Sequence, residues 1–317
     1  MITLKDLSQK LLSENKIALF MHTRPDGDTI GSTLSLYFAI KSKGIAVDVY
    51  CDDEIPDKFD YLNCKEIIKQ SIDGTYSALL AVDCADVTRL GAFGEFFSNH
   101  KNTYLIDHHV SNTRFAKHCY VIDNASNAEN VFDVINEMGV KIDINIANLL
   151  ATGVVTDTGN FAHKNVTFST LSVASKLVEL GADLNAIVYN TFKKQSKGRA
   201  KLFAKVMSKL RYFLDDSFAV ASVFLADLNE TGAKSSETEG FIDFIMGIED
   251  VKVGACIMET SQNKYKISFR SKKTDVNAVA GVFGGGGHVL ASGCQINGEY
   301  EEVVDKITCA VKRFIED

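Results

Sequence analysis

Short, unbroken runs of apolar residues constrain the fold of this chain more than any other feature of its sequence. Three such runs, at 17–22, 78–83 and 103–107, have the length of a strand and are apolar almost to their last position. Strands that are buried on both faces have this pattern, as in a parallel sheet covered by helices, whereas a half-exposed strand alternates. A fourth strand is predicted at 45–50. The first half of the chain is therefore predicted to be an α/β domain.

Segments with helical periodicity lie between and after these runs. Helices are predicted in the first half at 3–15, 29–43, 126–138, 143–155 and 169–180. In the remainder, strands are predicted at 218–225, 251–258 and 264–270, and helices at 236–247, 275–282 and 301–315. Together these patterns predict an α/β protein of two lobes. The N-terminal lobe has a mostly parallel sheet with helices on both faces, and the C-terminal lobe is a smaller α/β lobe.

The length of the chain also indicates two domains. At 317 residues it exceeds the roughly 250–300 residues at which a single hydrophobic core stops growing. Between Asp183 and Asp215 no acidic residue occurs, while eight Lys and Arg residues do, and we place the interdomain connection there. The predicted boundaries are 1–185 for the first domain, 186–214 for a helical linker and 215–317 for the second domain. The basic run could attract a polyanion, and a solvated helical face explains it equally well.

The net charge of −7 is divided unevenly along the chain. Residues 1–185 contain 16 Lys+Arg against 24 Asp+Glu, a balance of −8, and residues 186–317 contain 18 against 17, a balance of +1. The acidic first part suits cations, and the second part could bind an anion. The seven cysteines are scattered without a C-x-x-C pair, which predicts reduced core residues. Neither an export signal nor a run of about 18 apolar residues is found, so a cytoplasmic protein without a membrane span is expected.

Acidic residues and histidines stand at or just beyond the ends of the three apolar runs. They are His22, Asp26 and Asp28 after the first run, Asp83 at the end of the second, and Asp107, His108 and His109 at the end of the third. Ligands of open α/β sheets bind at the carboxyl ends of the strands. A further acid, Asp157, follows an apolar helical run and is flanked by glycines. Each group has its own structural explanation, such as a turn, a helix cap or a buried histidine, but one metal site accounts for all four more economically.

The composition of this cluster indicates the type of metal. Carboxylates combined with imidazole suit Mn²⁺, Mg²⁺, Co²⁺ or Fe²⁺ better than a thiolate zinc site, and no cysteine is placed to compete. The number of candidate ligands fits two ions. Two ions roughly 3.5–4 Å apart share a bridging water, lower its pKa and stabilise both the attacking and the leaving oxygen of phosphoryl transfer. The cluster therefore predicts metal-dependent phosphoryl chemistry, with Mn²⁺ as the first candidate.

In order and spacing, the four groups resemble the motifs of the DHH phosphoesterase superfamily, which includes RecJ-type exonucleases and family II pyrophosphatases. The resemblance covers about residues 15–165 and rests on His22-x-x-x-Asp26-x-Asp28-x-x-Gly31-Ser32, Asp83, Asp107-His108-His109 and Thr156-Asp157-Thr158-Gly159. It implies one ion held by His22, Asp26 and Asp83. It implies a second ion held by Asp28, Asp83, His108 and Asp157, with Asp83 bridging. His109 is expected to face the scissile phosphate and Asp107 to orient the histidine pair, so the expected catalytic residues are Asp83, Asp107 and His109.

Two features of the second domain resemble the DHH-associated substrate domain. They are Arg270-Ser271 at the end of a predicted strand and the glycine run that ends in His288. Glycines let backbone N–H groups approach phosphate oxygens, Arg270 can bind a phosphate with two hydrogen bonds, and His288 can donate another. The run follows the arginine-bearing strand and precedes a predicted helix start rich in small residues, which favours an anion site over a flexible linker. The expected substrate-binding residues are Arg270, Ser271, Gly285, Gly286, Gly287 and His288.

The order of the two domains, with no sensory, membrane or oligonucleotide-binding domain added, resembles the stand-alone NrnA-type group. The resemblance implies a DHH catalytic domain at 1–185 and a DHH-associated substrate domain at 215–317. It implies hydrolysis of short oligoribonucleotides, of linear dinucleotides such as pGpG and pApA or of cyclic dinucleotides, and of the 3′-phosphate of phosphoadenosine phosphate. Asn160 departs from many members of the group, and its effect on substrate choice is left open.

Other functions also fit parts of the sequence. An inorganic pyrophosphatase or polyphosphatase shares the metal motifs. A catalytically idle nucleotide-binding sensor could keep the fold, although idle descendants tend to lose the ligands that are intact here. A nonspecific nucleic-acid-binding protein is disfavoured because the chain is acidic and the basic run has few aromatic residues for stacking. The expected partner is short RNA or a nucleotide, without stable binding of long nucleic acid, and the oligomeric state, a homodimer included, is left open.

Overall fold

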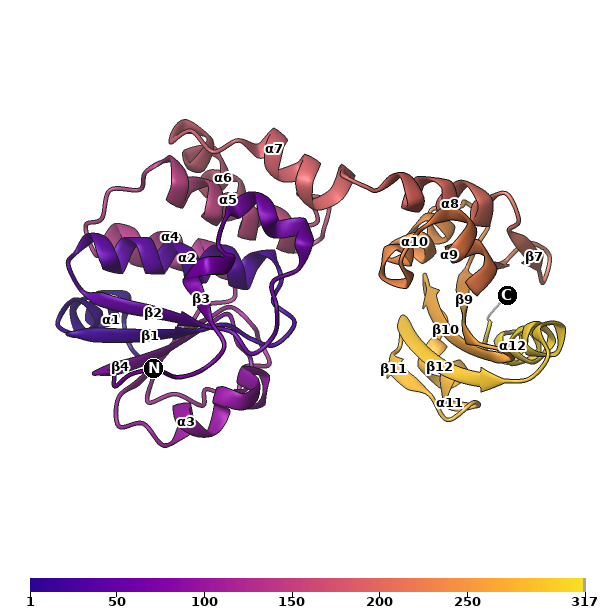
Figure 1. Ribbon diagram of the computed structural model, residues 1–317, viewed down its shortest axis with the longest axis horizontal. Helices are drawn as coiled ribbons and strands as arrows, with labels where there is room; N and C mark the ends of the chain where they lie inside the picture. Colours follow the sequence, from indigo (N-terminus) through magenta and orange to yellow (C-terminus); the bar gives the residue numbers. More distant parts are fainter. Residues whose placement is uncertain (316–317) are drawn as a thin grey trace. The chain divides into compact units, whose positions relative to one another are not determined.

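The computed structural model describes residues 1–315 and divides into a first unit, Met1–Lys194, and a second unit that begins at Gln195. Each unit contains one six-stranded sheet with helices packed against it (Figure 1). The predicted fold class, an α/β protein of two lobes, is therefore confirmed. None of the seven cysteines is in a disulfide. No helix within residues 1–315 has the length and apolar character needed to cross a membrane.

The sheet of the first unit is parallel throughout. Its strands lie in the order β3-β2-β1-β4-β5-β6. They are β1 (Lys16–Phe20), β2 (Ala46–Tyr50), β3 (Ile68–Lys69), β4 (Ala78–Val82), β5 (Thr103–Asp107) and β6 (His118–Val121). Every residue of β4 and β5 is buried, as expected for strands covered on both faces. Because all strands run in the same direction, the segments that follow β1, β4 and β5 emerge at the same edge.

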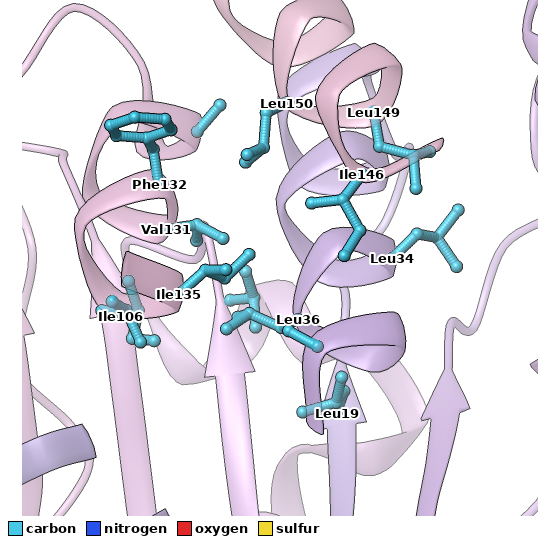
Figure 2. Close-up of a cluster of buried hydrophobic side chains, with 14 of the residues drawn as sticks. Leu19, Leu34, Leu36, Ile106, Val131, Phe132, Ile135, Ile146, Leu149 and Leu150 are labelled. Carbon is cyan, nitrogen blue, oxygen red and sulfur yellow. The ribbon is translucent and has the colours of Figure 1, made fainter. Parts of the chain in front are cut away.

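Helices cover both faces of this sheet. The helices of the first unit are α1 (Leu4–Leu12), α2 (Gly27–Ser42), α3 (Gly94–Ser98), α4 (Asn127–Glu137), α5 (Ile144–Asp157), α6 (Phe168–Glu179) and α7 (Leu184–Val188). On one face, α2, α4 and α5 pack over strand side chains such as Leu19 and Ile106 (Figure 2). On the other face, Phe20 packs with Phe93 and Phe97. Neighbouring residues of a strand point to opposite faces, so Leu19 and Phe20 belong to different cores.

Helices α2 and α5 approach each other closely because glycines line their contact. A Cβ added at Gly31 of α2 would lie 2.2 Å from the carbonyl oxygen of Leu149 on α5. On the α5 side, a Cβ added at Gly153 would lie 2.5 Å from Oδ1 of Asp28. Only glycine permits backbones to come this near. The contact places Asp28 on α2 near Asp157 at the end of α5.

The second unit has a mixed sheet in the order β11-β12-β10-β9-β8-β7. The strands are β7 (Arg211–Phe213), β8 (Phe218–Val223), β9 (Val253–Ser261), β10 (Lys264–Ser271), β11 (Gly286–His288) and β12 (Ala291–Asn297). The helices are α8 (Lys197–Met207), α9 (Leu225–Thr231), α10 (Phe241–Met246), α11 (Val276–Gly281) and α12 (Tyr300–Phe314). Helices α8, α9 and α10 cover one face of β8 and β9, while α11 and α12 pack against the other face. Much of the basic run forms α8, whose Leu202 and Val206 lie in the core of this unit.

Two predictions for this unit were wrong. The residues after His288 were expected to begin a helix, but β11 and β12 form an antiparallel hairpin. Buried and more exposed side chains alternate along β12, a period of two that fits a strand packed on a core. The single helix expected at 236–247 consists instead of a 3₁₀ turn, Ser235–Thr238, and α10. Gly240 separates them because its backbone is left-handed, with φ at 83°.

We predict that Gly31→Ala destabilises the first unit. The new methyl group would overlap the Leu149 carbonyl oxygen, which belongs to the backbone and cannot turn aside, so α2 and α5 would have to separate. Overpacking of this kind lowers the free energy of unfolding by about 1–3 kcal/mol. Urea unfolding followed by circular dichroism measures the change.

The matched control is Gly281→Ala in α11, where an added Cβ meets no atom within 4 Å. That substitution is expected to be neutral or stabilising, because alanine loses less conformational entropy than glycine on folding. If Gly31→Ala unfolded at the same urea concentration as the unaltered chain, α2 and α5 could not be in the close contact described.

Candidate metal centre

The side chains that the sequence assigns to a metal site gather at one edge of the parallel sheet. His22 follows β1, Asp83 follows β4, Asp107 ends β5 and is followed by His108 and His109, Asp26 and Asp28 begin α2, and Asp157 ends α5. They form three groups whose potential ligand atoms lie within 4.8 Å of one another: His22–Asp26–Asp83, Asp28–His108–Asp157 and Asp83–His108–His109. The structure thus brings together all six residues predicted as metal ligands, with His109 beside them.

Asp83 lies between the first two groups. Its Oδ2 is 3.7 Å from Nε2 of His22, and its Oδ1 is 3.5 Å from Nε2 of His108. The carboxylate is buried, and Oδ1 accepts no hydrogen bond within residues 1–315. A buried carboxylate oxygen without a partner is unfavourable unless a cation compensates for it. The backbone of Asp83 is also left-handed, with φ at 56°, an uncommon conformation for a non-glycine residue that recurs at functional sites.

The two histidines at the cluster each face carboxylates through Nε2. Nε2 of His22 is 3.7 Å from Oδ2 of Asp26. Nε2 of His108 is 3.4 Å from Oδ2 of Asp157 and 4.0 Å from Oδ2 of Asp28. Oxygen and nitrogen atoms at these separations could bind the same ion.

The other ring nitrogen of each histidine is held by a backbone carbonyl. Nδ1 of His22 lies 2.8 Å from the carbonyl oxygen of Thr23, and Nδ1 of His108 lies 3.0 Å from that of Asn124. A carbonyl oxygen only accepts, so Nδ1 carries the hydrogen in these bonds. In a neutral ring with its hydrogen on Nδ1, the lone pair of Nε2 points toward the acids. A histidine that binds a metal through Nε2 requires this tautomer.

The carboxylate of Asp28 accepts hydrogen bonds from α4 and from its own helix, α2. Its Oδ2 accepts a hydrogen bond from the backbone N–H of Asn127 at 2.5 Å, and its Oδ1 accepts one from the N–H of Ala128 at 2.9 Å. The hydroxyl of Ser32 donates to the same Oδ1 at 3.1 Å. These bonds fix the fully buried carboxylate in the cluster and connect α2 to the first turn of α4.

Two of the clustered carboxyls have raised pKa values, whereas for Asp83 burial is outweighed by the hydrogen bond from His22 and the charges of the histidines, which lower its pKa. Burial, followed by the charges of Asp28 and Asp83, raises the pKa of Asp157 to about 10. Burial, followed by the charge of Asp83, raises the pKa of Asp28 to about 7. Burial lowers the pKa of His22, but the carboxylates of Asp83 and Asp26 outweigh it and raise the pKa overall. Buried acids that resist ionisation in this way fit divalent cations, which reverse the local electrostatics.

His109 is held by Asp107. Nδ1 of His109 donates to Oδ1 of Asp107 at 2.9 Å, and this bond raises the pKa of His109 to about 9. Asp107 is fully buried, and its Oδ2 accepts further hydrogen bonds from the His109 backbone N–H and the Asn112 side chain. The imidazole of His109 is half-exposed at the edge of the cluster. Asp107 therefore fixes the ring while Nε2 remains able to donate to a ligand.

Sequence reasoning missed the residues that support these side chains. Asn130 on α4 is buried, and its side-chain nitrogen donates to the backbone carbonyls of Asp107 and Ile122 at 3.0 Å each. Its side-chain oxygen accepts from Asn124, the residue whose carbonyl binds His108. A buried asparagine on the apolar face of a helix is the signal that could have identified Asn130. Asn124 acts on His108 through its backbone, which leaves no sequence signal.

The predicted substrate-binding side chains of the second unit lie in one row across three strands. Arg270 of β10 is paired with Ala291 of β12, and Ala291 is paired with His288 of β11. Residues directly opposite each other point to the same face of a sheet, so Arg270 and His288 share a face with the small Ala291 between them. The hydroxyl of Ser271, by contrast, donates to the carbonyl of Thr274 within the turn.

The glycine run is largely engaged in the fold itself. The N–H groups of Gly284 and Gly285 donate to the carbonyls of Gly281 and Ala280, and that of Gly287 donates to the Asn277 side chain. Gly285 is also needed for packing, since a Cβ there would lie 2.3 Å from the Gly293 carbonyl oxygen.

Gly286 differs from the other glycines of this run. A Cβ at Gly286 would meet only the Asn277 oxygen, at 3.6 Å, and no positive φ requires glycine there. Packing therefore explains Gly285, whereas the absence of a side chain at Gly286 is not explained by the fold and leaves space over β11.

Comparisons with known proteins agree with this arrangement. Residues 16–154 match the family model described as "DHH family, N-terminal domain", and residues 215–317 match the DHHA1 domain. A bifunctional oligoribonuclease and PAP phosphatase NrnA of Thermus thermophilus is 30% identical over 305 residues, which are 93% of this chain and 90% of the relative. A probable manganese-dependent inorganic pyrophosphatase of Streptococcus agalactiae is 25% identical over 267 residues, which are 75% of this chain and 83% of the relative. The crystal structure of an exopolyphosphatase-related protein from Bacteroides fragilis is 26% identical, with a TM-score of 0.84 over 98% of this chain and 96% of its own.

We predict that binding of Mn²⁺ releases protons at pH 7. The pKa of Asp157 is about 10 and that of Asp28 about 7, so at pH 7 Asp157 is protonated and Asp28 is about half protonated, and a cation must displace these protons. The raised pKa values of His22 and His108 act in the same direction. The affinity for Mn²⁺ is therefore expected to rise as the pH is increased from 6 to 8. Calorimetric titration in two buffers of different ionisation enthalpy gives the number of protons released.

The control for this titration is Asp157→Asn, which has no carboxyl proton to lose at that position. It is expected to release fewer protons than the unaltered chain under the same conditions. Binding that releases no protons and does not depend on pH would mean that the carboxyls are already ionised and do not repel one another as described.

Proposed function

Because the chain belongs to the DHH family of phosphoesterases, we propose that it hydrolyses short oligoribonucleotides, linear dinucleotides such as pGpG and pApA, and the 3′-phosphate of phosphoadenosine phosphate. The observation that carries this proposal is the meeting of two ligand groups at the carboxylate of Asp83, whose Oδ1 accepts no hydrogen bond within residues 1–315. The substrate class is supported by the oligoribonuclease and PAP phosphatase of T. thermophilus, which matches 93% of the chain, across both units.

Two divalent ions are part of the proposal. His22, Asp26 and Asp83 would hold one, and Asp28, Asp83, His108 and Asp157 would hold the other. Divalent ions in such a site supply Lewis acidity and a water-derived nucleophile at neutral pH. Mn²⁺ is the proposed metal, and the manganese-dependent relative supports it, with Mg²⁺, Co²⁺ and Fe²⁺ as alternatives that suit the same oxygen and nitrogen ligands.

The protein's own groups act on the scissile phosphate from the edge of the cluster. His109, protonated at neutral pH through its bond to Asp107, would donate from Nε2 to a phosphate oxygen and offset the charge that develops there. Asp107 keeps the ring in that orientation and is not itself exposed to substrate. Asp83 is shared between the two ligand groups, so it fixes their separation.

The second unit would bind the part of the nucleotide away from the scissile bond. Arg270 offers a guanidinium that can bind a phosphate through two hydrogen bonds, and His288 on the same face offers another donor. Gly286 lies on β11, two residues before His288, and has no side chain to obstruct a ligand. Three further residues are proposed to shape this face without binding the ligand directly: Ser271, Gly285 and Gly287. The hydroxyl of Ser271 and the N–H of Gly287 already donate hydrogen bonds within the unit, and Gly285 packs against the backbone of Gly293.

A pyrophosphatase or polyphosphatase is the second candidate. The relative from S. agalactiae and the structure from B. fragilis support it, because their names refer to pyrophosphate and polyphosphate. A cyclic-dinucleotide phosphodiesterase is a further variant of the same chemistry. A nucleotide-binding sensor without activity is disfavoured because the six proposed ligands lie in groups that could hold a metal ion. A cytoplasmic location, a homodimer and the absence of stable binding to long nucleic acid stay predictions.

Product analysis after incubation with Mn²⁺ tests the proposal directly. The panel contains RNA two to five nucleotides long, pGpG, pApA, cyclic dinucleotides, phosphoadenosine phosphate and pyrophosphate. We expect mononucleotides from the short RNA and the linear dinucleotides, and AMP from phosphoadenosine phosphate. Turnover of pyrophosphate alone would select the second candidate, and turnover of nothing on the panel would favour the sensor.

We predict that Asp83→Ala abolishes hydrolysis and removes the stabilisation of the fold by Mn²⁺. The substitution removes a buried carboxylate whose Oδ1 has no hydrogen-bond partner within residues 1–315 and is open to a cation. It also removes the residue shared by both ligand groups, so the increase in melting temperature that Mn²⁺ gives the unaltered chain should disappear. Thermal unfolding with and without Mn²⁺, together with activity, measures both effects.

Asp123→Ala is the control for the loss of one negative charge, since Asp123 is exposed and belongs to none of the ligand groups. It should keep both the activity and the response to Mn²⁺. Activity of Asp83→Ala close to that of the unaltered chain would refute the proposed centre.

A further inference from the structure

Arg89 stands on a turn whose backbone is fixed at several points. The turn, Val87–Phe93, begins at Asp86, whose carbonyl accepts from the Arg89 backbone N–H at 3.0 Å. The carbonyl of Arg89 in turn accepts from the backbone N–H of Thr23 at 2.7 Å. Leu90, the next residue, is completely buried in the core around Phe20. Arg89 is therefore held beside the loop that contains His22.

The far end of the same turn is fixed by Asp52. Its Oδ2 accepts from the backbone N–H of Ala92 at 3.0 Å. Gly91 has a left-handed backbone, with φ at 58°, and a Cβ there would lie 2.2 Å from the same carboxylate oxygen. The turn that presents Arg89 therefore requires a glycine at position 91 and is held by the hydrogen bond from Ala92 to Asp52.

The side chain of Arg89 is exposed and lacks an anionic partner. Its Nη2 lies 3.0 Å from Nδ1 of His22 and 3.4 Å from the carbonyl oxygen of Thr23. Within residues 1–315 it forms no ion pair with a carboxylate, although Asp26 and Asp83 lie on the other side of the His22 ring. The guanidinium consequently stands at the rim of the acidic cluster without being neutralised by it.

The tautomer of His22 decides what the guanidinium can bind. When Nε2 of His22 acts as a ligand, the hydrogen of the neutral ring is on Nδ1 and is donated to the carbonyl of Thr23. Nδ1 then has no lone pair for Arg89, whose N–H groups can only donate. In the ligand-bearing state of His22, Nη2 of Arg89 keeps only the Thr23 carbonyl as an acceptor, and the other N–H groups of the guanidinium have no acceptor within residues 1–315.

We propose that the missing acceptor is the phosphate group of the substrate, so that Arg89 binds the oxygens of the phosphate held at the cluster. A planar guanidinium with five N–H donors matches two phosphate oxygens at once. Arg89 is a substrate-binding residue of the first unit, distinct from Arg270 in the second. The inference rests on the proposed function, because it requires a phosphate ester or phosphate product at the cluster.

The test compares Arg89→Ala and Arg89→Lys in the full-length protein loaded with Mn²⁺. Calorimetric titrations with inorganic phosphate and with AMP measure anion binding, and a separate titration with Mn²⁺ measures metal binding. We expect Arg89→Ala to weaken binding of both phosphate and AMP by about 10- to 100-fold, as for the loss of hydrogen bonds to a charged group. Arg89→Lys keeps the charge and loses the paired donors, so its affinity for phosphate and AMP should lie between those of Arg89→Ala and the unaltered chain.

Arg313→Ala is the matched control, because Arg313 is exposed on α12 and its removal changes the net charge equally. It should bind both anions like the unaltered chain. The Mn²⁺ affinity of Arg89→Ala should change by less than about threefold, well below the change in anion binding. The Michaelis constant for short RNA should rise by the same factor as the dissociation constant for AMP.

Three outcomes would overturn the inference. Unchanged binding of phosphate and AMP would mean that Arg89 does not contact the anion. A loss of Mn²⁺ affinity as large as the loss of anion binding would mean that Arg89 only positions His22. Weaker binding of AMP with unchanged binding of phosphate would place Arg89 against the nucleoside. Failure of the proposed function gives a different result, since a chain that hydrolyses pyrophosphate but no nucleotide can still be titrated with inorganic phosphate.

Discussion

The carboxylate of Asp28 is the group on which both the site and the first core depend. It lies fully buried on α2, faces His108, and accepts the backbone N–H groups of Asn127 and Ala128 at the start of α4. The first N–H groups of a helix have no partner within the helix and attract negative charge. Ser126, at the N-cap position of α4, makes no capping bond with its own side chain. A candidate metal ligand thus caps a neighbouring helix, and its position cannot change without loosening α2 and α4 together.

Much of the first unit could be predicted because its local patterns agree with its tertiary structure. The runs that form β1, β4 and β5 are apolar throughout because both faces are covered, and the acids that follow them meet because parallel strands end at one edge. Helix starts were visible where a polar side chain caps the first turn, as Thr3 does for α1 and Asp143 for α5. The candidate ligands could be identified before the fold was known, because each is a charged or imidazole side chain next to an apolar run.

What could not be predicted depends on residues far apart in the sequence. The strand order places β1 between β2 and β4, which no local pattern encodes. Asn124 supports His108 through a backbone carbonyl, and a carbonyl is the same in every residue type. Arg89 meets His22 only because two loops from neighbouring strands lie side by side. The hairpin after His288 was taken for a helix start because small residues suit both, and pairing with β10 decides between them.

The glycine contact between α2 and α5 bears on which ions the cluster can accept. Gly31 and Gly153 bring the two helices together and thereby set the space between Asp28 and Asp157. Magnesium prefers oxygen ligands at about 2.0–2.1 Å and calcium at about 2.3–2.6 Å, with more ligands around the larger ion. A cluster that cannot widen discriminates by ionic radius even where its oxygen ligands would suit either ion. At the proposed metal site, selection against large cations would therefore depend in part on two glycines that are not ligands themselves.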